Sequence, residues 1–250
     1  MTRGTGRTVI EIKNLHVAFD GREVISGVDL AVSRGQTLVL MGKNGSGKTV
    51  ILKCIAGLND EYSGEIMVGD TGLSSGTKDR PHLAYVFQKG GLFDSMNVFD
   101  NVAFGLRRMG MPEDEVARRV EQSLARVGLK GNEGKLPSEL SGGMQKRVGL
   151  ARAVCADPDI ILYDDPAAGL DPVLSDSIAD LMLEIRDSLK TTSIVVTHDL
   201  KVAEKIADTV ALLYEGRIVF SGSGRDFFSR ENAYARQFID GDILGPIDIM

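Results

Sequence analysis

Apolar and polar residues alternate along the first part of the chain. The alternation covers residues 9–19, breaks at the turn dipeptide Asp20-Gly21 and resumes over residues 28–32. A two-residue period is typical of strands that bury one face, so we predict two strands on either side of this turn. The pattern changes at residues 37–41, a compact apolar run that suits a strand covered on both faces.

Helical patterns begin after this run. The first starts at Gly47 and continues to Leu58, which completes a strand, loop and helix unit. Three more helices are predicted at residues 98–108, at 112–127 with Pro112 in the first turn, and at 142–155. These three indicate an inserted helical lobe.

Strand patterns return after the lobe. They cover residues 160–163 and 193–196, and a late hairpin over residues 210–220 has its turn at Glu215-Gly216. The alternation of strands and helices predicts a parallel sheet covered by helices, which makes the fold class α/β. Residues 234–250 have little periodicity, and a frayed terminus is one interpretation of them.

Composition narrows the classes of protein. Of the 250 residues 43% are apolar, enough for a core, and 29 Lys and Arg against 35 Asp and Glu give a net charge of −6. That balance argues against a general nucleic-acid binder. No apolar run reaches the roughly 18 residues that span a bilayer, and residues 1–7 lack a signal-peptide core, so we expect a cytoplasmic chain. Cys54 and Cys155 lack metal-site spacing and are interpreted as buried thiols.

Residues 42–49 have the pattern G-x-x-x-x-G-K-[ST] between an apolar strand and a helix, the context that indicates a phosphate-binding loop. Glycines let backbone N–H groups point at phosphate oxygens, and the helix N-terminus adds partial positive charge. We expect Lys48 to bridge the β- and γ-phosphates and the Thr49 hydroxyl to ligate Mg²⁺. The predicted nucleotide-binding residues are Gly42, Lys43, Asn44, Gly45, Ser46, Gly47, Lys48, Thr49 and Val50.

Two carboxylates, Asp164 and Asp165, follow the apolar strand at residues 160–163. Ligands of such folds bind at the carboxyl ends of the strands. We expect Asp164 to hold Mg²⁺, directly or through water, and Asp165 to orient or deprotonate the attacking water. A helix cap or a turn is the alternative interpretation of this pair.

Further motifs follow in a fixed order. The turn Ser141-Gly142-Gly143 opens a helix and offers N–H donors to phosphate, although by itself it is also compatible with a plain capped helix. Gln88 follows the apolar residues 84–87, a Gly-Leu-Asp stretch ends at Asp171, and His198 follows residues 194–197. Taken together, these motifs resemble the ATP-binding cassette (ABC) family over nearly the whole chain.

The resemblance implies how the chain is organised. It predicts a P-loop NTPase domain at residues 8–241, with an ABC-type antiparallel β subdomain and a parallel RecA-like core sheet. The core would comprise residues 8–88 and 156–224, the inserted α-helical subdomain about 89–155, and a C-terminal extension 234–250. The extension would reach the partner ATPase subunit.

The same resemblance implies a mechanism. ATP and Mg²⁺ would bind in a head-to-tail dimer, in which the Ser141 turn of one copy closes over ATP held by Lys48 of the other. Phe19 would stack on adenine, and a core aromatic is the alternative. Gln88 would bind Mg²⁺ and sense the γ-phosphate, while His198 would contact the γ-phosphate unless it is an ordinary strand-end histidine.

Two positions depart from the pattern of the family. Asp165 stands where the family usually has Glu, one methylene longer, so its reach to water is shorter and slower turnover is expected. Met144 stands where Gln is common, and it leaves phosphate contacts by the backbone intact.

The stretch after Gln88 narrows the resemblance. Its Leu-Phe-Asp-Ser segment at residues 92–95 resembles ATPases of Mla- and Mce-type phospholipid transporters, as do the Ser-Gly-Gly-Met turn and residues 236–246. The likeness implies a membrane permease, an Mce-domain lipid-binding protein as a further partner, and a location on the inner face of the cell membrane. Phe93, Met96 and Phe99 would transmit motion to the permease, and packing inside the lobe is the alternative.

Two other hypotheses remain open. A soluble ABC machine for DNA repair, chromosome structure or translation usually has coiled-coil insertions or two cassettes, and the sequence has neither. A small-molecule kinase would need an acceptor pocket and a lid but not the Ser141 turn or His198. An ATPase for another transported solute is compatible with every motif above.

Overall fold

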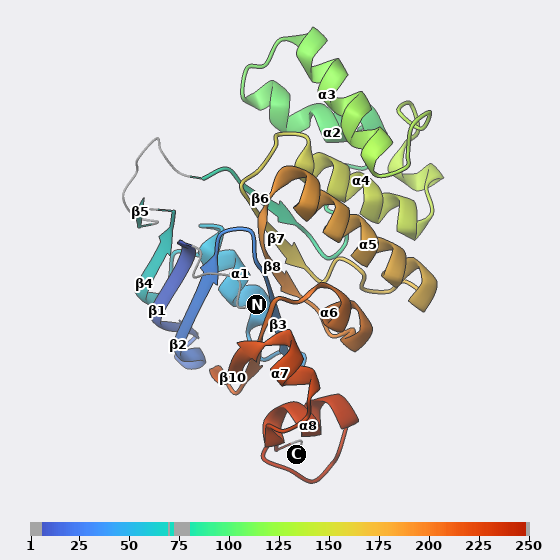
Figure 1. The fold of residues 1–250 in the computed structure, drawn as a ribbon. Coiled ribbons are helices and arrows are strands. Elements are labelled where there is room, and N and C mark those ends of the chain that lie inside the picture. The colour runs from blue at the N-terminus through green and yellow to red at the C-terminus, as the bar shows by residue number, and fades with distance from the viewer. Residues whose placement is uncertain (1–6, 70, 73–80, 249–250) are drawn as a thin grey trace. The chain divides into compact units, whose positions relative to one another are not determined.

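The computed structural model describes residues 7–69, 71–72 and 81–248, so the first residues considered for a signal peptide and the last two of the predicted C-terminal extension lie outside it. The chain divides into two compact units, Met1–Pro81 with Thr192–Met250, and His82–Thr191. Figure 1 labels their helices and strands. The domain limits proposed from the resemblance stay a prediction.

An antiparallel sheet begins the first unit. Its strand order is β2-β1-β4-β5, with bounds β1 Thr8–Phe19, β2 Arg22–Ser33, β4 Ser63–Val68 and β5 Thr71–Gly72. The predicted turn between β1 and β2 is confirmed, because Asp20 and Gly21 both have positive φ, 50° and 76°. Two positive φ values match the right-handed twist of a hairpin. The alternating apolar side chains of β1 are buried on one face.

A mostly parallel sheet carries the phosphate loop. In it β3 (Thr37–Gly42) lies between the parallel strands β8 (Thr192–Val196) and β9 (Thr209–Tyr214), and β10 (Arg217–Ser223) pairs antiparallel with β9. All six residues of β3 are buried, as its continuous apolar run predicted. The hairpin turn at Glu215-Gly216 is also confirmed.

Helices of the first unit correct two predictions. They are α1 Lys48–Ile55, α6 Leu200–Ile206, α7 Gly224–Phe228 and α8 Ala233–Asp240. Helix α1 stops three residues before Leu58, which is 58% exposed, because Gly57 takes the left-handed conformation that ends helices. The frayed-terminus interpretation is wrong for residues 234–248, since Asn232 caps α8 and Gly241 closes it with a positive φ of 71°.

The second unit contains two parallel strands and most of the long helices. β6 (Leu83–Val86) pairs with β7 (Ile160–Asp164), with Tyr85 opposite Leu162. The helices are α2 Val98–Arg108, α3 Glu113–Arg126, the short 3₁₀ helix η2 Pro137–Glu139, α4 Gly142–Val154 and α5 Pro172–Leu189. Pro112 is the N-cap of α3 rather than a residue of its first turn, because its extended backbone precedes the first helical residue. Cys54 and Cys155 are buried and unpaired, as predicted.

Among the helices that the structure describes, none has the length and apolarity needed to cross a bilayer.

Candidate functional site

The phosphate loop connects β3 to α1 and depends on glycine. Gly42 has a φ of 147°, and a Cβ built there would lie 2.2 Å from the carbonyl oxygen of Leu213. Gly47 has a φ of 104°, and its Cβ would lie 2.5 Å from Cδ1 of Ile25. Both positions combine a left-handed backbone with a close neighbour, so only glycine fits without displacement.

Lys48 holds the centre of this loop. Its side chain is buried, and its ammonium donates to the carbonyl oxygens of Gly42 at 2.8 Å and Lys43 at 2.9 Å. The nearby Ser46 Oγ is buried and has no hydrogen-bond partner in the part of the chain described. A buried ammonium, an unsatisfied hydroxyl and a helix N-terminus without acidic residues in its first turn fit an anionic ligand such as a polyphosphate.

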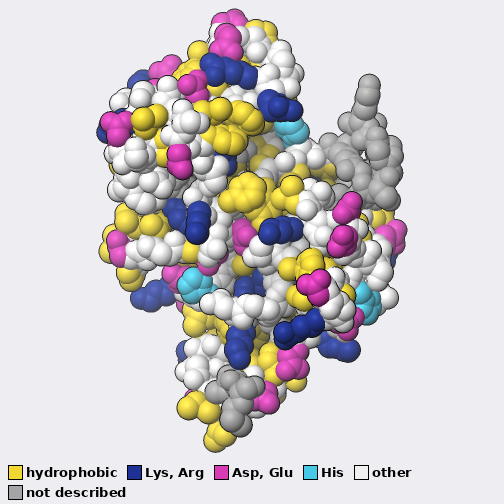
Figure 2. Space-filling view, turned by 180° about the vertical axis from the view of Figure 1, so that it is seen from behind, with side chains coloured by type: hydrophobic (Ala, Val, Ile, Leu, Met, Phe, Trp, Pro, Cys, Tyr) yellow, Lys and Arg dark blue, Asp and Glu magenta, His cyan; other side chains and the backbone are white. Residues whose placement is uncertain are grey.

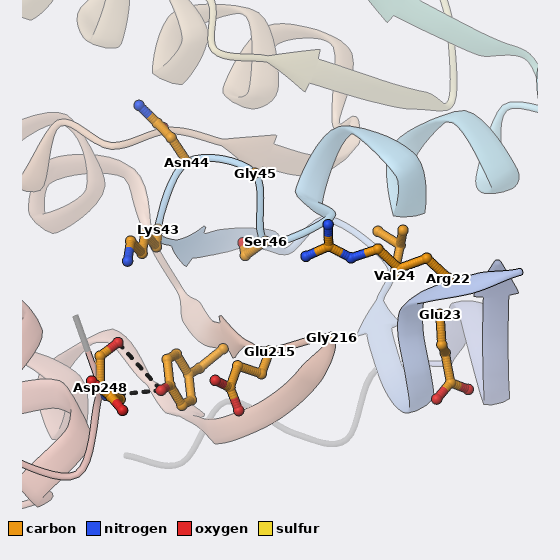
Figure 3. Close-up of a pocket in the computed structure, with 11 residues that line it drawn as sticks. Arg22, Glu23, Val24, Lys43, Asn44, Gly45, Ser46, Glu215, Gly216 and Asp248 are labelled. Atoms are coloured by element: carbon orange, nitrogen blue, oxygen red, sulfur yellow. Dashed lines mark hydrogen bonds between the residues drawn. The ribbon is translucent and has the colours of Figure 1, made fainter. Parts of the chain in front are cut away.

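A cavity of about 640 Å³ lies beside the loop (Figure 3). The loop contributes four consecutive residues from Lys43, and β2 contributes Arg22, whose side chain extends toward the loop. Glu215 and Asp248 bring carboxylates to the same cavity. Sequence patterns predicted none of these last three residues, because Arg22 and Glu215 lie at hairpin turns and Asp248 in an aperiodic tail.

The C-terminal segment is fastened beside this cavity. Tyr214 accepts a hydrogen bond from the Asp248 backbone N–H at 2.8 Å and donates to the Asp248 carbonyl oxygen at 3.3 Å (Figure 3). The buried Gln237 amide of α8 binds both backbone groups of Ile247, at 2.6 and 2.9 Å. The tail is therefore an ordered part of the first unit up to residue 248.

Two more predicted residues belong to the first unit. Phe19 ends β1 and is 42% exposed, so the interpretation as a core aromatic is wrong and the ring is available for stacking. His198 is exposed in the short connection between β8 and α6, next to Asp199, which caps α6 through the N–H groups of Lys201 and Val202.

The carboxylate pair belongs to the second unit. Asp164 is the last residue of β7 and is 8% exposed. The Tyr85 hydroxyl donates to Asp164 Oδ2 at 3.0 Å, and burial, together with this carboxylate, raises the pKa of Tyr85. Asp165 is equally buried and has a positive φ of 49°. A left-handed backbone at a non-glycine residue stores strain, and such residues gather at functional sites.

Gln88 lies in the same unit as the carboxylates. Its side chain is exposed, and its backbone carbonyl oxygen accepts a hydrogen bond from the ammonium of Lys146 on α4. Burial lowers the pKa of Lys146, and the carboxylate of Asp165 partly opposes that shift. Lys146 thus donates a hydrogen bond to the backbone of Gln88 and interacts electrostatically with Asp165. The spacing of the motifs did not reveal this connection.

The Ser-Gly-Gly turn forms the N-terminus of α4. Ser141 is the N-cap, and its hydroxyl accepts from the N–H of Met144 at 3.3 Å, so the turn is a capped helix start as well. Ser141 and Gly142 are exposed, and a Cβ at Gly142 would meet nothing within 4 Å. The first N–H groups of α4 are consequently accessible to an anion.

The family is decided by comparison with known proteins. Residues 25–168, more than half of the chain, match the family described as "ABC transporter". The chain belongs to the ABC transporter family. The fold class predicted from the resemblance is confirmed, and this ABC subunit is an ATPase.

Relatives of this ABC subunit are similar along almost all of it. The probable ribonucleotide transport ATP-binding protein mkl of Mycobacterium tuberculosis is 37% identical over 95% of this chain and 68% of its own length. The Fe(3+) ions import ATP-binding protein FbpC of Escherichia coli is 35% identical over 96% and 73%. The intermembrane phospholipid transport system ATP-binding protein MlaF of Haemophilus influenzae is 34% identical over 96% and 94%.

Two solved structures share the fold. The first is cbiO1 from Clostridium perfringens, part of the ABC transporter complex cbiONQ, with a TM-score of 0.81, 28% identity and coverage of 93% of this chain and 95% of its own. The second is the ATP-binding cassette MJ0796, a dimer in a post-hydrolysis state bound to ADP and Pi, with a TM-score of 0.78, 27% identity and coverage of 86% and 99%.

The predicted site residues of the ABC ATPase form two sets. The phosphate loop, Phe19 and His198 are in the first unit, and Gln88, the Ser141 turn and the carboxylate pair are in the second. The described residues contain no group of three or more His, Cys, Asp or Glu side chains suited to a metal. The predicted Mg²⁺ ligands, Thr49, Gln88 and Asp164, include one carboxylate and remain a prediction.

Proposed function

We propose that this ABC ATPase binds ATP with Mg²⁺ and drives a membrane permease that transports phospholipid or another lipid at the bacterial envelope. The nucleotide part of the proposal rests on the phosphate loop, whose buried Lys48 and glycine backbone fit a polyphosphate. Mg²⁺ would neutralise the charge that develops on the phosphates during hydrolysis, with Thr49, Gln88 and Asp164 as its ligands.

Roles of the remaining site residues are part of this proposal. Asp165 orients or deprotonates the attacking water, His198 contacts the γ-phosphate, and Phe19 stacks on adenine. The exposed turn at Ser141 serves the ATP bound to a second copy of the chain, in a head-to-tail dimer. Support for a dimer comes from MJ0796, which is a dimer bound to ADP and Pi at 27% identity.

An apolar groove of about 570 Å³ in the second unit carries the proposal of a permease partner. It is lined by the exposed aromatic side chains Phe87 and Phe93 and by Phe104 and Met109, with Arg152 among them. Hydrophobic side chains gather on the face of the helical unit in Figure 2. A concave surface with exposed aromatic anchors suits an amphipathic helix of a partner, which would lay its apolar face into the groove.

The wall of the groove is rigid where Phe93 belongs to it. Asn101, which is fully buried, accepts from the Phe93 N–H at 2.8 Å and donates to the carbonyl oxygens of Phe93, Met96 and Asn97 at 2.9 to 3.1 Å. The Phe93 ring also packs on Phe104, with 4.7 Å between centroids. Phe93 is therefore the strongest of the three proposed transmitting residues, since Met96 and Phe99 do not line the groove.

Cargo is the finer part of the proposal. Three relatives of similar identity are named for ribonucleotide, iron and phospholipid transport, so overall similarity does not select one cargo. The lipid proposal rests on the Leu-Phe-Asp-Ser segment at residues 92–95 and on MlaF, which this chain matches over 94% of the length of that relative.

Copurification from the native membrane tests the proposal. We expect the full chain to bring down a permease whose presence stimulates phosphate release, and lipid to stimulate it further. Phe93→Asp should lose the permease and the stimulation while keeping basal ATPase activity. Leu58→Asp is the control, because it changes an apolar residue outside the groove that is 58% exposed, against 40% for Phe93. If Phe93→Asp still binds the permease, the groove is not part of the interface. If iron or a ribonucleotide stimulates phosphate release and lipid does not, the proposed lipid cargo is wrong.

A further inference from the structure

A tyrosine contacts the proposed magnesium carboxylate. The Tyr85 hydroxyl donates a 3.0 Å hydrogen bond to Oδ2 of Asp164, although the two residues are 79 positions apart. Tyr85 is one of the apolar residues before Gln88 and also lines the apolar groove, but none of the roles proposed above uses its hydroxyl. The acceptor is a carboxylate oxygen, and hydrogen bonds to carboxylates are shorter and stronger than bonds between neutral groups.

The strand register explains how the two side chains meet. Tyr85 on β6 lies opposite Leu162 on the parallel strand β7, and Asp164 follows Leu162 by two residues. Residues in register, and residues two apart on one strand, point to the same face of a sheet. Tyr85 and Asp164 therefore share a face, and the long phenol side chain spans the remaining two-residue step of roughly 7 Å.

The surroundings hold the phenol in place. Its ring packs on Phe87, with centroids 4.6 Å apart and planes inclined by 43°. Asp164 is buried, so its carboxylate has little access to water as a competing donor. A fixed donor on one oxygen restricts rotation of the carboxylate about its last side-chain bond.

We infer that Tyr85 is a positioning residue that orients the Asp164 carboxylate for Mg²⁺. The inference rests on the proposed role of Asp164 as a magnesium ligand. Second-layer hydrogen bonds commonly orient metal-binding carboxylates, and removing one lowers metal affinity. Tyr85 acts on the metal only through Asp164, so its loss should weaken metal binding and leave metal-free nucleotide binding unchanged.

Manganese binding to the full chain tests the inference. Mn²⁺ replaces Mg²⁺ as the probe, and its free concentration is followed by electron paramagnetic resonance in the presence of ADP. Tyr85→Phe keeps every ring carbon that packs on Phe87 and removes only the hydroxyl. We expect it to raise the Kd for Mn²⁺ about tenfold, which is the loss of one hydrogen bond to a carboxylate. ADP affinity in the presence of a chelator should not change.

Three comparisons make the result decisive. Tyr234→Phe removes a phenol oxygen from α8 and should leave both affinities unchanged. A wild-type Mn²⁺ affinity in Tyr85→Phe overturns the inference, and so does a loss of ADP affinity without metal, because that pattern indicates a general structural role. Asp164→Asn separates the proposed role of Asp164 from that of Tyr85. If Asp164→Asn keeps the wild-type affinity for Mn²⁺, the proposed metal role of Asp164 fails. If Asp164→Asn loses Mn²⁺ affinity while Tyr85→Phe keeps it, the role of Asp164 stands and only the inference about Tyr85 fails.

Discussion

Two glycines of the phosphate loop give a stringent test of the loop geometry. Gly42 and Gly45 both have positive φ, 147° and 80°, in one short segment. A Cβ at Gly45 would meet nothing within 4 Å, whereas a Cβ at Gly42 would lie 2.2 Å from the carbonyl oxygen of Leu213. Gly42→Ala and Gly45→Ala therefore differ in steric overlap and share backbone strain.

The two substitutions should differ in free energy of unfolding. Gly45→Ala costs the left-handed strain alone, about 1 to 2 kcal/mol. In Gly42→Ala the backbone strain costs about 1 to 3 kcal/mol, and the steric overlap with Leu213 costs about 1 to 3 kcal/mol more. The total loss of stability is therefore about 2 to 6 kcal/mol. The overlap is with a backbone oxygen of β9, which has no rotatable bond to move it aside.

Chemical denaturation of the nucleotide-free chain measures both values. We expect the midpoint in guanidinium chloride to fall clearly more for Gly42→Ala than for Gly45→Ala, and the slope to stay unchanged. Titration with a fluorescent ATP analogue should then show weaker binding by Gly42→Ala, because the displaced loop no longer holds Lys48 against its carbonyl oxygens. Equal destabilisation by the two variants would refute the assignment of steric overlap to Gly42.

Three further predictions concern other parts of the chain. Asp165→Asn should lower the rate of phosphate release at least about 100-fold and trap an ATP-bound dimer, which gel filtration would detect, while Asp165→Glu should keep or raise turnover. An unchanged rate in Asp165→Asn would contradict the proposed role of this carboxylate. Gln237→Leu should leave both backbone groups of Ile247 without a partner, which costs roughly 1 to 3 kcal/mol of folding stability for each group. Amide hydrogen exchange at Ile247 should become faster, and an unchanged exchange rate would show that other contacts hold the tail. Burial raises the pKa of Cys155 to about 11, so the thiol stays protonated at pH 8. Iodoacetamide should therefore label Cys155 at least about 100-fold more slowly in the folded chain than in urea, and rapid labelling of the folded chain would contradict its burial.

Features encoded by neighbouring residues were predictable. The dipeptides Asp20-Gly21 and Glu215-Gly216 each supply a glycine, which adopts positive φ without strain, so both hairpin turns followed from the sequence. The glycine spacing of residues 42–47 encodes the loop in the same way, because each glycine marks a backbone conformation that other residues avoid. The family itself was recognisable from the order of such local motifs.

Features that depend on exposure were only partly predictable. A phenylalanine at position 19 suits the core and a stacking surface equally well, and only its 42% exposure distinguishes these two interpretations. The same ambiguity applied to Phe93, Met96 and Phe99, of which only Phe93 lines the apolar groove. Leu58 continued the helical period but lies beyond Gly57, because a local helix-ending conformation overrides periodicity.

Pairs between segments distant in sequence escaped prediction altogether. The contact of Tyr85 with Asp164 requires the register of β6 against β7, and the link from Lys146 to Gln88 requires the packing of α4 beside that strand. Neither register nor packing is written in the residues that form the pair. Yet these pairs attach to the motif residues that were recognised, Asp164 and Gln88. Local motifs thus point to the residues proposed for the chemistry, while the long-range pairs determine how each of those residues is held.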